Sequence, residues 1–291
     1  MRDQRRGQRF LAELAGIGQD LPYSPALLRD LFSLTGESSM TSLEKIGQVI
    51  SQDQSLTARI LALANSAFYG LQGRVTSVPR AVTLLGLKEI RNLVLILAAQ
   101  ALVQRHGFPE GFDLRQYWEH QLSTAVCAKV LGKTLAADQR DLDLDILFTA
   151  GLLHDFGKLL TAMYRPDDWT TIDKLRRAER VAYVQAEELH WGLEHGLIGA
   201  MTLDSWNLPP ELTEPVNWHH APSLAPAFSL QPKLVCLADA LHHRLDTPDM
   251  ALSSAALEVL KEFGGDQDAL LDALRATLQD ERLGQLVSQL A

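Results

Sequence analysis

The sequence predicts an all-α fold, and three observations support that prediction. Apolar residues recur every three or four positions along nearly the whole chain, which is the period of a helix with one buried face. Short alternating runs of β-branched and aromatic residues, which mark strands, are scarce. Of the 291 residues, 46% are hydrophobic and 22% charged, a composition typical of a globular protein. This length suits one large domain or two ordinary ones.

Helix start and stop signals divide the first third of the chain into short helices. Hydroxyl residues and a proline in the first turn mark their beginnings, and glycine or asparagine marks their ends. The predicted helices begin at a capping box at residues 41–44, near Ser55, at Ser77 and at residue 87; the second ends in segment 65–70, Gly86 ends the third, and the fourth runs to about residue 104. A break containing Pro109 and Gly111, at residues 108–113, separates this region from the next.

The net charge and the length of the apolar runs limit the kinds of partner and the location that we expect for the protein. The 27 basic and 36 acidic residues give a net charge of −9, which disfavours a protein that coats the phosphates of nucleic acid. The longest apolar run, residues 93–103, is too short for the ~20 residues that cross a bilayer, so we expect no membrane span. Cys127 and Cys236 lie in apolar runs and are typical of buried thiols in a reducing compartment. We therefore expect a cytoplasmic protein.

Several motifs in the first lobe occur in the order found in a known family. They are residues 21–22 (LP), 50–56 (ISQDQSL), 65–70 (NSAFYG), 81–86 (AVTLLG) and 91–93 (RNL). Together they resemble the HDOD family, a helical, HD-related output module of bacterial signalling proteins. One departure is Gln54, where family members usually have proline. The resemblance implies a regulatory module whose partners are signalling proteins or a receiver-type domain.

A second group of residues predicts a metal site. His154 and Asp155 are adjacent within an apolar stretch that we expect to be one helix, and burying such a pair without partners is costly. A metal ion supplies a partner, and His120 and Asp239 complete a set of nitrogen and oxygen ligands. Such a set suits a divalent transition metal (Fe, Mn, Zn, Co or Ni) better than calcium.

Further residues extend this set to two ions. His195, His219 and His220 add enough ligands for a second ion. Lys158, one helical turn after His154, is placed to contact a phosphate oxygen or a metal-bound water. The alternative is that each histidine is a hydrogen-bonded core residue, which is the commoner role of a lone buried histidine. The remaining histidines are interpreted as surface or helix-end residues: His106, His190, His242 and His243.

The same residues resemble the H…HD…D pattern of the HD phosphohydrolase superfamily, and the extra histidines and Lys158 resemble the ligand set of the HD-GYP phosphodiesterases. This resemblance gives ligand roles to His120, His154, Asp155, His195, His219, His220 and Asp239, and a substrate-phosphate role to Lys158. After His220 the chain lacks the Glu, Asp-Gly and Gly-Tyr-Pro elements of those phosphodiesterases. That departure argues against hydrolysis of cyclic dinucleotides.

Three functions follow, in decreasing order of support. The first is a signalling output module that acts through protein contacts and keeps an HD-type metal pocket. The second is an active metal-dependent phosphohydrolase, on a nucleotide or cyclic dinucleotide or another phosphorylated small molecule. The third is a DNA-binding regulator, which is weak because predicted helix 55–64 carries only Arg59 as a basic residue.

The expected organisation has four segments. They are an N-terminal extension or linker remnant (1–19), an N-terminal helical lobe (20–107), an HD-like helical lobe with the metal site (108–249) packed against the first lobe, and C-terminal amphipathic helices (250–291). The last segment holds seven acidic and three basic residues and is interrupted at Gly264 and Gly265. Its charged face is either solvated or an interaction surface.

Overall fold

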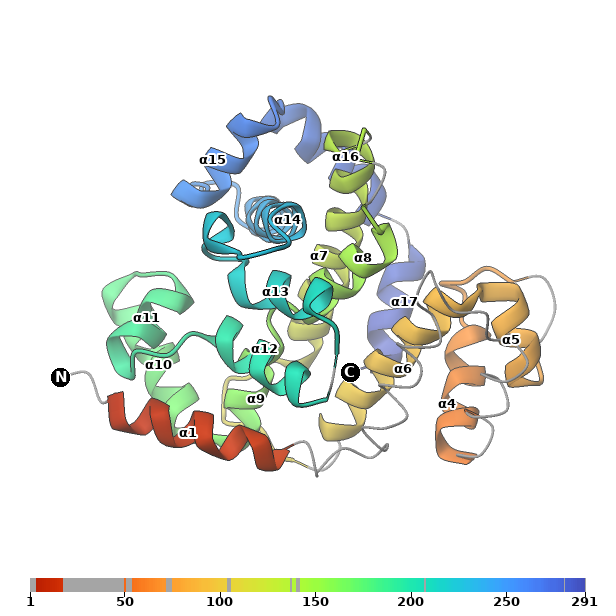
Figure 1. Ribbon diagram of the computed structural model, residues 1–291, viewed down its shortest axis with the longest axis horizontal. Coiled ribbons are helices and arrows are strands. Elements are labelled where there is room, and N and C mark those ends of the chain that lie inside the picture. Colours follow the sequence, from red (N-terminus) through yellow and green to blue (C-terminus); the bar gives the residue numbers. More distant parts are fainter. Residues whose placement is uncertain are drawn as a thin grey trace.

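The computed structural model describes residues 4–17, 50, 54–71, 75–103, 106–136, 138–139, 142–206, 208–279 and 281–290. Within these ranges the chain forms α-helices joined by turns, with one short 3-10 helix and no strand (Figure 1). The prediction of an all-α fold is therefore confirmed. The predicted helix at residues 41–44 and the motif at 21–22 lie outside the described residues.

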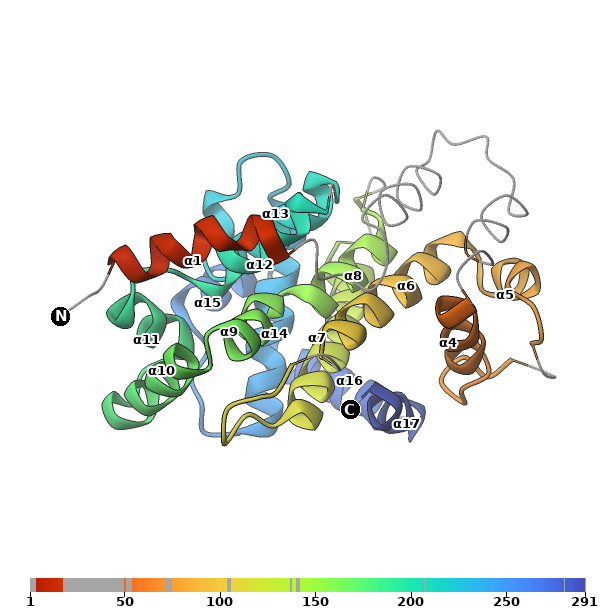
Figure 2. The same cartoon turned by 90° about the horizontal axis from the view of Figure 1, so that it is seen from below.

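The first lobe consists of α4 (Gln54–Ala64), α5 (Val78–Leu85) and α6 (Leu87–Val103). Ser77 caps α5 by accepting a hydrogen bond from the backbone N–H of Arg80, as its position before Pro79 predicts. The side chain of Asn65 accepts a hydrogen bond from the backbone N–H of Val75 and donates one to its carbonyl. Asn65 is the first residue of the motif at residues 65–70, and these two bonds fix the turn that follows α4. Figure 2 shows α4 and α5 at one end of the molecule, joined to the rest by α6.

The second lobe begins after the predicted break and contains the longest helix, α7. Its elements are α7 (Leu114–Leu135), α8 (Leu144–Leu153), α9 (Phe156–Tyr164), α10 (Pro166–Glu179), α11 (Tyr183–His190), α12 (His195–Ser205), α13 (Pro210–Trp218), the 3-10 helix Pro222–Leu224 and α14 (Leu230–Asp246). Asp113 and Asp143 cap α7 and α8 through their carboxylates. The two lobes meet where α6 packs on α8, with Lys88 paired to Asp143 at 2.6 Å.

The apolar stretch that contains His154 and Asp155 is two helices rather than one. His154 ends α8 and Asp155 precedes α9, so the prediction of a continuous helix is wrong. The segment Leu144–Tyr164 is long and apolar enough to cross a membrane by composition, yet 89% of its apolar 18-residue window is buried inside the fold. It is a core segment whose break places two polar side chains at the centre of the lobe.

Helices from both ends of the chain cover the second lobe. Residues 4–17, expected as an extension or linker remnant, include α1 (Gln4–Ile17), which packs on α12 and buries Phe10 (Figure 1). The C-terminal segment forms α15 (Ser254–Glu262), α16 (Gln267–Leu278) and α17 (Glu281–Leu290). Gly264, at a φ of 62°, ends α15 in the left-handed conformation, and α17 packs on α7.

Candidate metal centre

The fold brings the seven ligands predicted from the sequence into one cluster. They come from α7 (His120), the α8–α9 junction (His154 and Asp155), the first residue of α12 (His195), the end of α13 (His219 and His220) and α14 (Asp239). These segments are spread over about 120 residues of the chain, so the cluster exists only in the folded lobe. Most of its members are buried, with His120, His220 and Asp239 partly exposed.

Glycines allow the helices that carry these residues to approach closely. A Cβ atom at Gly157 would lie 2.0 Å from the carbonyl oxygen of His195, so α9 touches the start of α12 backbone to backbone. A Cβ atom at Gly196 would lie 2.9 Å from the carbonyl oxygen of Asn217. Any side chain at these two positions would force apart the segments that carry the ligands.

The first half-site is the group formed by His120, His154, Asp239 and the Oδ2 atom of Asp155. His120 Nε2 lies 3.2 Å from His154 Nε2, 3.2 Å from Asp239 Oδ1 and 3.5 Å from Asp155 Oδ2. His154 Nε2 lies 3.6 Å from each of the two carboxylate oxygens. Four donor atoms therefore converge on one point between α7, α14 and the α8–α9 junction.

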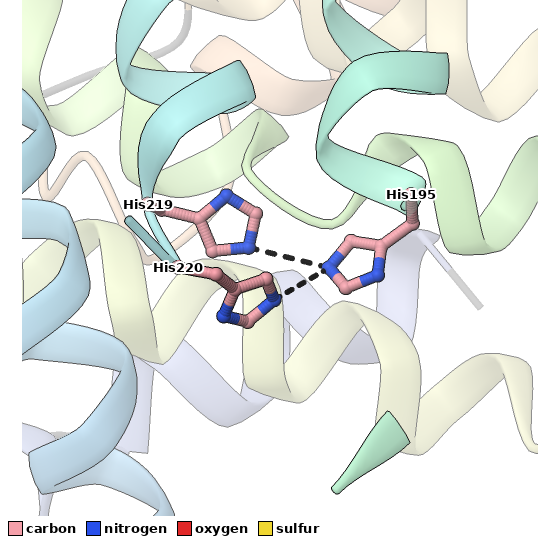
Figure 3. Close-up of side chains that lie close together, drawn as sticks. All are labelled: His195, His219 and His220. Carbon is pink, nitrogen blue, oxygen red and sulfur yellow. Dashed lines mark hydrogen bonds between the residues drawn. The ribbon is translucent and has the colours of Figure 1, made fainter. Parts of the chain in front are cut away.

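The second half-site is the group formed by His195, His219, His220 and the Oδ1 atom of Asp155. His195 Nε2 lies 3.0 Å from His220 Nε2 and 3.2 Å from His219 Nε2, as Figure 3 shows. It lies 3.0 Å from Asp155 Oδ1, which is 3.8 Å from His219 Nε2. The two oxygens of Asp155 thus face different sets of histidines, which is the geometry of a carboxylate that bridges two ions.

Backbone and carboxylate acceptors fix the orientation of the inner histidines. His154 Nδ1 donates to the carbonyl of Gly151 and His219 Nδ1 donates to that of Val216, each at 2.7 Å. A carbonyl only accepts, so in the neutral imidazole the Nε2 lone pair is left pointing into the cluster. His195 Nδ1 lies 2.6 Å from the buried carboxylate of Glu187, the carboxylate–histidine arrangement that supports metal ligands.

The protonation states of four proposed ligands suit a cation, whereas for His195 burial is outweighed by the charges of Glu187 and Asp155, which raise the pKa to about 9, so its ring is charged in the metal-free chain. Burial lowers the pKa of His120 to about 4 and, with help from His195, that of His220 to about 3, so both rings are neutral. Burial raises the pKa of Asp155, but Lys158 and neighbouring histidines outweigh it, and the carboxyl stays ionised well below its ordinary value. In Asp239 burial is likewise outweighed, first by His243. Neutral imidazoles and ionised carboxylates are the forms that bind metal.

Two further observations test whether an ion fits. Asp155 Oδ1 and Asp239 Oδ1 are buried and accept no well-aligned hydrogen bond from any described residue, although imidazole nitrogens surround both. Ligand atoms bound at about 2.1 Å to one ion lie roughly 3.0 Å apart in octahedral coordination and roughly 3.4 Å apart in tetrahedral coordination. The separations in both half-sites, 3.0 to 3.8 Å, match such edges. The donor set fits one divalent transition ion in each half-site.

Lys158 lies beside the Asp155 carboxylate. Its Nζ is 2.6 Å from Asp155 Oδ2 and 5.2 Å from the centre of the Tyr183 ring. Burial lowers the pKa of this ammonium, but Asp155 and Asp239 raise it more, so the side chain remains charged. The helix break places His154 at the end of α8 and Lys158 on α9, so the two do not share one helix as predicted. The contact of Lys158 is with Asp155, and its phosphate role stays a prediction.

Three residues of the cluster were missed by the sequence reasoning. Glu187 orients His195 from eight residues upstream, a spacing that signals nothing by itself. His242 and His243 were interpreted as surface or helix-end residues, but His242 is buried with its Nδ1 3.1 Å from His120 Nδ1. His243 Nε2 lies 3.3 Å from Asp239 Oδ1, and the four-residue spacing from Asp239 on α14 was a signal for it.

Comparison with known families gives one match, the HDOD domain, over residues 21–222. An uncharacterized protein of Treponema pallidum is 26% identical over 217 residues, which are 75% of this chain. The chain spans only 41% of the length of that relative.

Solved structures show the same fold. A candidate phosphohydrolase from Shewanella amazonensis is 26% identical, with a TM-score of 0.71 over 97% of this chain and 98% of its own. An HDOD domain protein of unknown function from Geobacter sulfurreducens has a TM-score of 0.75 at 21% identity, over 99% of both chains. A candidate signal transduction protein from Marinobacter aquaeolei has a TM-score of 0.77 at 23% identity, and this chain covers 65% of it.

Proposed function

The chain belongs to the HDOD family, and on that premise we propose that it is a cytoplasmic signal-transduction output module that keeps a two-ion HD-type metal centre. Its output passes through contacts with signalling proteins or a receiver-type domain. The name of the Marinobacter aquaeolei structure supports a signalling context. The two cysteines are free and buried, which suits a reducing compartment.

The observation that carries the metal centre is the position of Asp155 between two sets of imidazoles. Its Oδ1 atom is 3.0 Å from His195 Nε2 and its Oδ2 atom is 3.5 Å from His120 Nε2. A buried carboxylate that only made ion pairs would align with its donors, whereas Oδ1 accepts no well-aligned hydrogen bond from the described residues. The ligands in this proposal are His120, His154, Asp155 and Asp239 for one ion, and Asp155, His195, His219 and His220 for the other.

Bound divalent ions would supply Lewis acidity and compensate the buried carboxylates. Residues of the chain orient the ligands. Glu187 and the carbonyls of Gly151 and Val216 fix the imidazole rings of His195, His154 and His219, and the ammonium of Lys158 pairs with Asp155. In a regulatory module, bound ions would favour one conformation of the lobe through these interactions. A partner protein that binds this conformation would then respond to the ions.

Metal analysis tests this function directly. Protein purified without chelators is analysed by mass spectrometry for Fe, Mn, Co, Ni and Zn, and we expect two transition ions per chain. His154→Gln removes one Nε2 ligand and is expected to lose the first ion. His106→Gln is the matched control, because His106 packs on Tyr164 outside the cluster. A wild-type chain that holds no transition ion and takes none up contradicts the proposal.

An active phosphohydrolase is the second candidate, favoured by Lys158. This ammonium is 19% exposed next to the bridging carboxylate, where it can reach a phosphate oxygen. The name of the Shewanella amazonensis structure supports the same reaction class. Turnover of nucleotides or cyclic dinucleotides by the metal-loaded chain, lost in Lys158→Met and in His154→Gln, would establish this candidate in place of the non-enzymatic one.

A further inference from the structure

The geometry points to His243 as an additional protein ligand of the first half-site, an assignment that rests on the proposed two-ion centre. His243 lies on α14, one helical turn after Asp239, so both side chains project from the same face. Its Nε2 atom is 3.3 Å from Asp239 Oδ1. Its ring stacks on His120, with ring centres 4.7 Å apart and planes 25° apart. The donor atoms of His120, Asp239 and His243 all lie within 4.8 Å of one another.

The surroundings of Asp239 Oδ1 support ligation over simple ion pairing. Three imidazole Nε2 atoms surround this oxygen, those of His120 at 3.2 Å, His243 at 3.3 Å and His154 at 3.6 Å. The oxygen nevertheless accepts no well-aligned hydrogen bond from the described residues. The three nitrogen atoms lie close to this oxygen, but their ring N–H directions are not aligned with it. We infer that the nitrogens and the oxygen are directed at one point between them, where a cation would lie.

His243 joins the first ion and does not create a third. His120 belongs both to the group with His154 and Asp155 and to the group with Asp239 and His243, and its Nε2 atom lies 3.5 Å from Asp155 Oδ2 and 3.2 Å from Asp239 Oδ1. One imidazole nitrogen has one lone pair and binds one ion. The other nitrogen of His120 faces His242 Nδ1 at 3.1 Å and is not directed at the cluster. Both groups therefore describe a single ion with five protein donors.

A five-donor site has a functional consequence. An octahedral ion with five protein ligands keeps one position for a solvent or substrate atom, whereas four protein ligands leave two. His243 is also the most exposed member of the cluster, with 42% of its side chain accessible. It therefore limits access to the first ion from the solvent side.

Cobalt substitution tests this ligand. The full chain is stripped with chelator and loaded with Co²⁺, which gives a near-ultraviolet charge-transfer band when a thiolate coordinates it. His243→Cys is expected to show a band that is absent from the wild type and from His106→Cys, the control outside the cluster. His243→Ala is expected to bind the first ion at least about 10-fold more weakly. Because His243 is exposed, neither substitution disturbs the core.

Two failures of this experiment are distinguishable. If wild-type chain binds no Co²⁺, both the metal centre and the role of His243 are overturned. If wild type and His243→Cys bind two Co²⁺ equally well and no charge-transfer band forms, only the role of His243 is overturned.

From a separate observation we infer that α1 positions His195, so that docking of α1 and occupancy of the second half-site support each other. Phe10 is fully buried and stacks on Trp191 with ring centres 5.7 Å apart. A Cβ atom at Gly7 would lie 3.0 Å from the carbonyl oxygen of Trp191 and 3.2 Å from the Cβ of Leu193. Helix α1 therefore contacts the turn at residues 191–194 directly.

That turn leads into His195. The indole N–H of Trp191 donates to the carbonyl of Leu193 at 2.8 Å, which fixes the shape of the turn. From the other side, Glu187 accepts from the backbone N–H of His195 at 3.1 Å and from its ring at 2.6 Å. The turn is thus held between α1 and Glu187, and His195 is the next residue along the chain. Because coupling between two sites is reciprocal, ion binding must stabilise the docked α1.

Trypsin reports this coupling, since it cleaves after arginines of α1 only when the helix leaves the lobe. Saturating Co²⁺ is expected to slow cleavage after Arg9 by about 10-fold in wild type and not in His195→Gln. Phe10→Ala is expected to weaken the second ion by the same factor, while Gln8→Ala, on the exposed face of α1, changes neither quantity. If Phe10→Ala is cleaved faster but binds both ions as tightly as wild type, the inference is overturned. If wild type binds no ion, the proposed metal centre itself is contradicted.

Discussion

The two half-sites share Asp155 but differ in their access to solvent. In the second half-site the side chains of His195 and His219 are wholly inaccessible. In the first, His120 is 13% exposed, and the neighbouring His243 is 42% exposed. Among the ligands of the second half-site only His220 is partly exposed, so this half-site is the more closed of the two, and the first is the more open to exchange.

The difference arises from how each half-site is built. The second depends on backbone contacts between short helices, because α9, α12 and α13 touch at Gly157 and Gly196. The first depends on side chains that extend between the long helices α7 and α14. Backbone contacts tolerate no added atoms, whereas side chains adjust, so the same perturbation is expected to affect the two half-sites unequally.

Gly157→Ala should give the largest effect. Its new methyl group would lie 2.0 Å from the carbonyl oxygen of His195, a clash that only a backbone shift relieves. We expect a loss of about 3 kcal/mol in unfolding free energy, at the upper end of overpacking costs, and loss of the second ion with the first retained. Urea unfolding and a Co²⁺ titration measure both. Gly284→Ala is the control, because nothing lies within 4 Å of a Cβ there. Two intact half-sites in Gly157→Ala would contradict the contrast drawn here.

Removal of either ion alone should come next in size. At a free-ion concentration of 100 times the dissociation constant, each ion stabilises the fold by about 2.7 kcal/mol. Thermal unfolding of the loaded chain, followed with and without EDTA, measures this gain. His220→Gln removes a ligand of the second half-site only, and it should leave roughly half of the gain. Equal unfolding temperatures with and without EDTA would show that neither half-site holds an ion.

Glu187→Gln should weaken the second half-site alone. The substitution keeps the shape of the side chain but replaces the carboxylate that accepts from His195 Nδ1 at 2.6 Å. Loss of such an orienting partner typically costs 10- to 100-fold in metal affinity, or about 1.4 to 2.7 kcal/mol. Titration with Co²⁺ should show one weakened and one unchanged ion. Glu188→Gln, at the exposed neighbouring position, is the matched control, and a similar loss there would assign the effect to charge alone.

The sequence was a good guide to elements whose signals are local. Ser77 before Pro79 predicted the start of α5, and the position of Gly86 predicted its end. The break between α8 and α9 has no such signal, because residues 152–156 contain neither glycine nor proline. Packing of Gly157 against His195 accompanies that break, and this contact spans 38 positions of the chain. Periodicity therefore gave the helical class but not the junction at which His154 and Asp155 lie.

The cluster shows the same division between local and distant signals. His154 and Asp155 stand out in sequence because polar residues are costly in an apolar segment. Glu187 has no comparable signal in the sequence. It orients His195 only because the turn after α11 brings the two residues together. Phe10 likewise stacks on a residue 181 positions away, so no local signal placed α1 on the second lobe, and residues 1–19 were expected to be an extension or linker remnant. Ligand roles for the seven residues stay a prediction that metal analysis decides.

The smallest expected effect is a pH dependence of the unfolding free energy of the metal-free chain, which differs between the two half-sites. Burial lowers the pKa of His195, but Glu187 and Asp155 raise it more, from 6.5 to about 9. The charged ring therefore stabilises the fold fully below pH 6.5, and this contribution is lost as the pH rises through 9. Burial lowers the pKa of His120 to about 4, so its contribution is lost only as the pH falls below 6.5.

Between pH 7 and 8 the folded chain keeps the proton on His195, whose pKa is about 9, whereas the unfolded chain has largely lost it, because the ordinary pKa of histidine is 6.5. Asp239 raises the pKa of His243 as well, and this acts in the same direction. Each titrating proton changes the free energy of unfolding by at most about 1.4 kcal/mol over that unit. Urea unfolding in EDTA should therefore show wild type becoming less stable from pH 7 to 8, and His195→Gln less so. An equal slope in both chains would mean that the buried second half-site holds His195 neutral, and that Glu187 orients the ring without charging it.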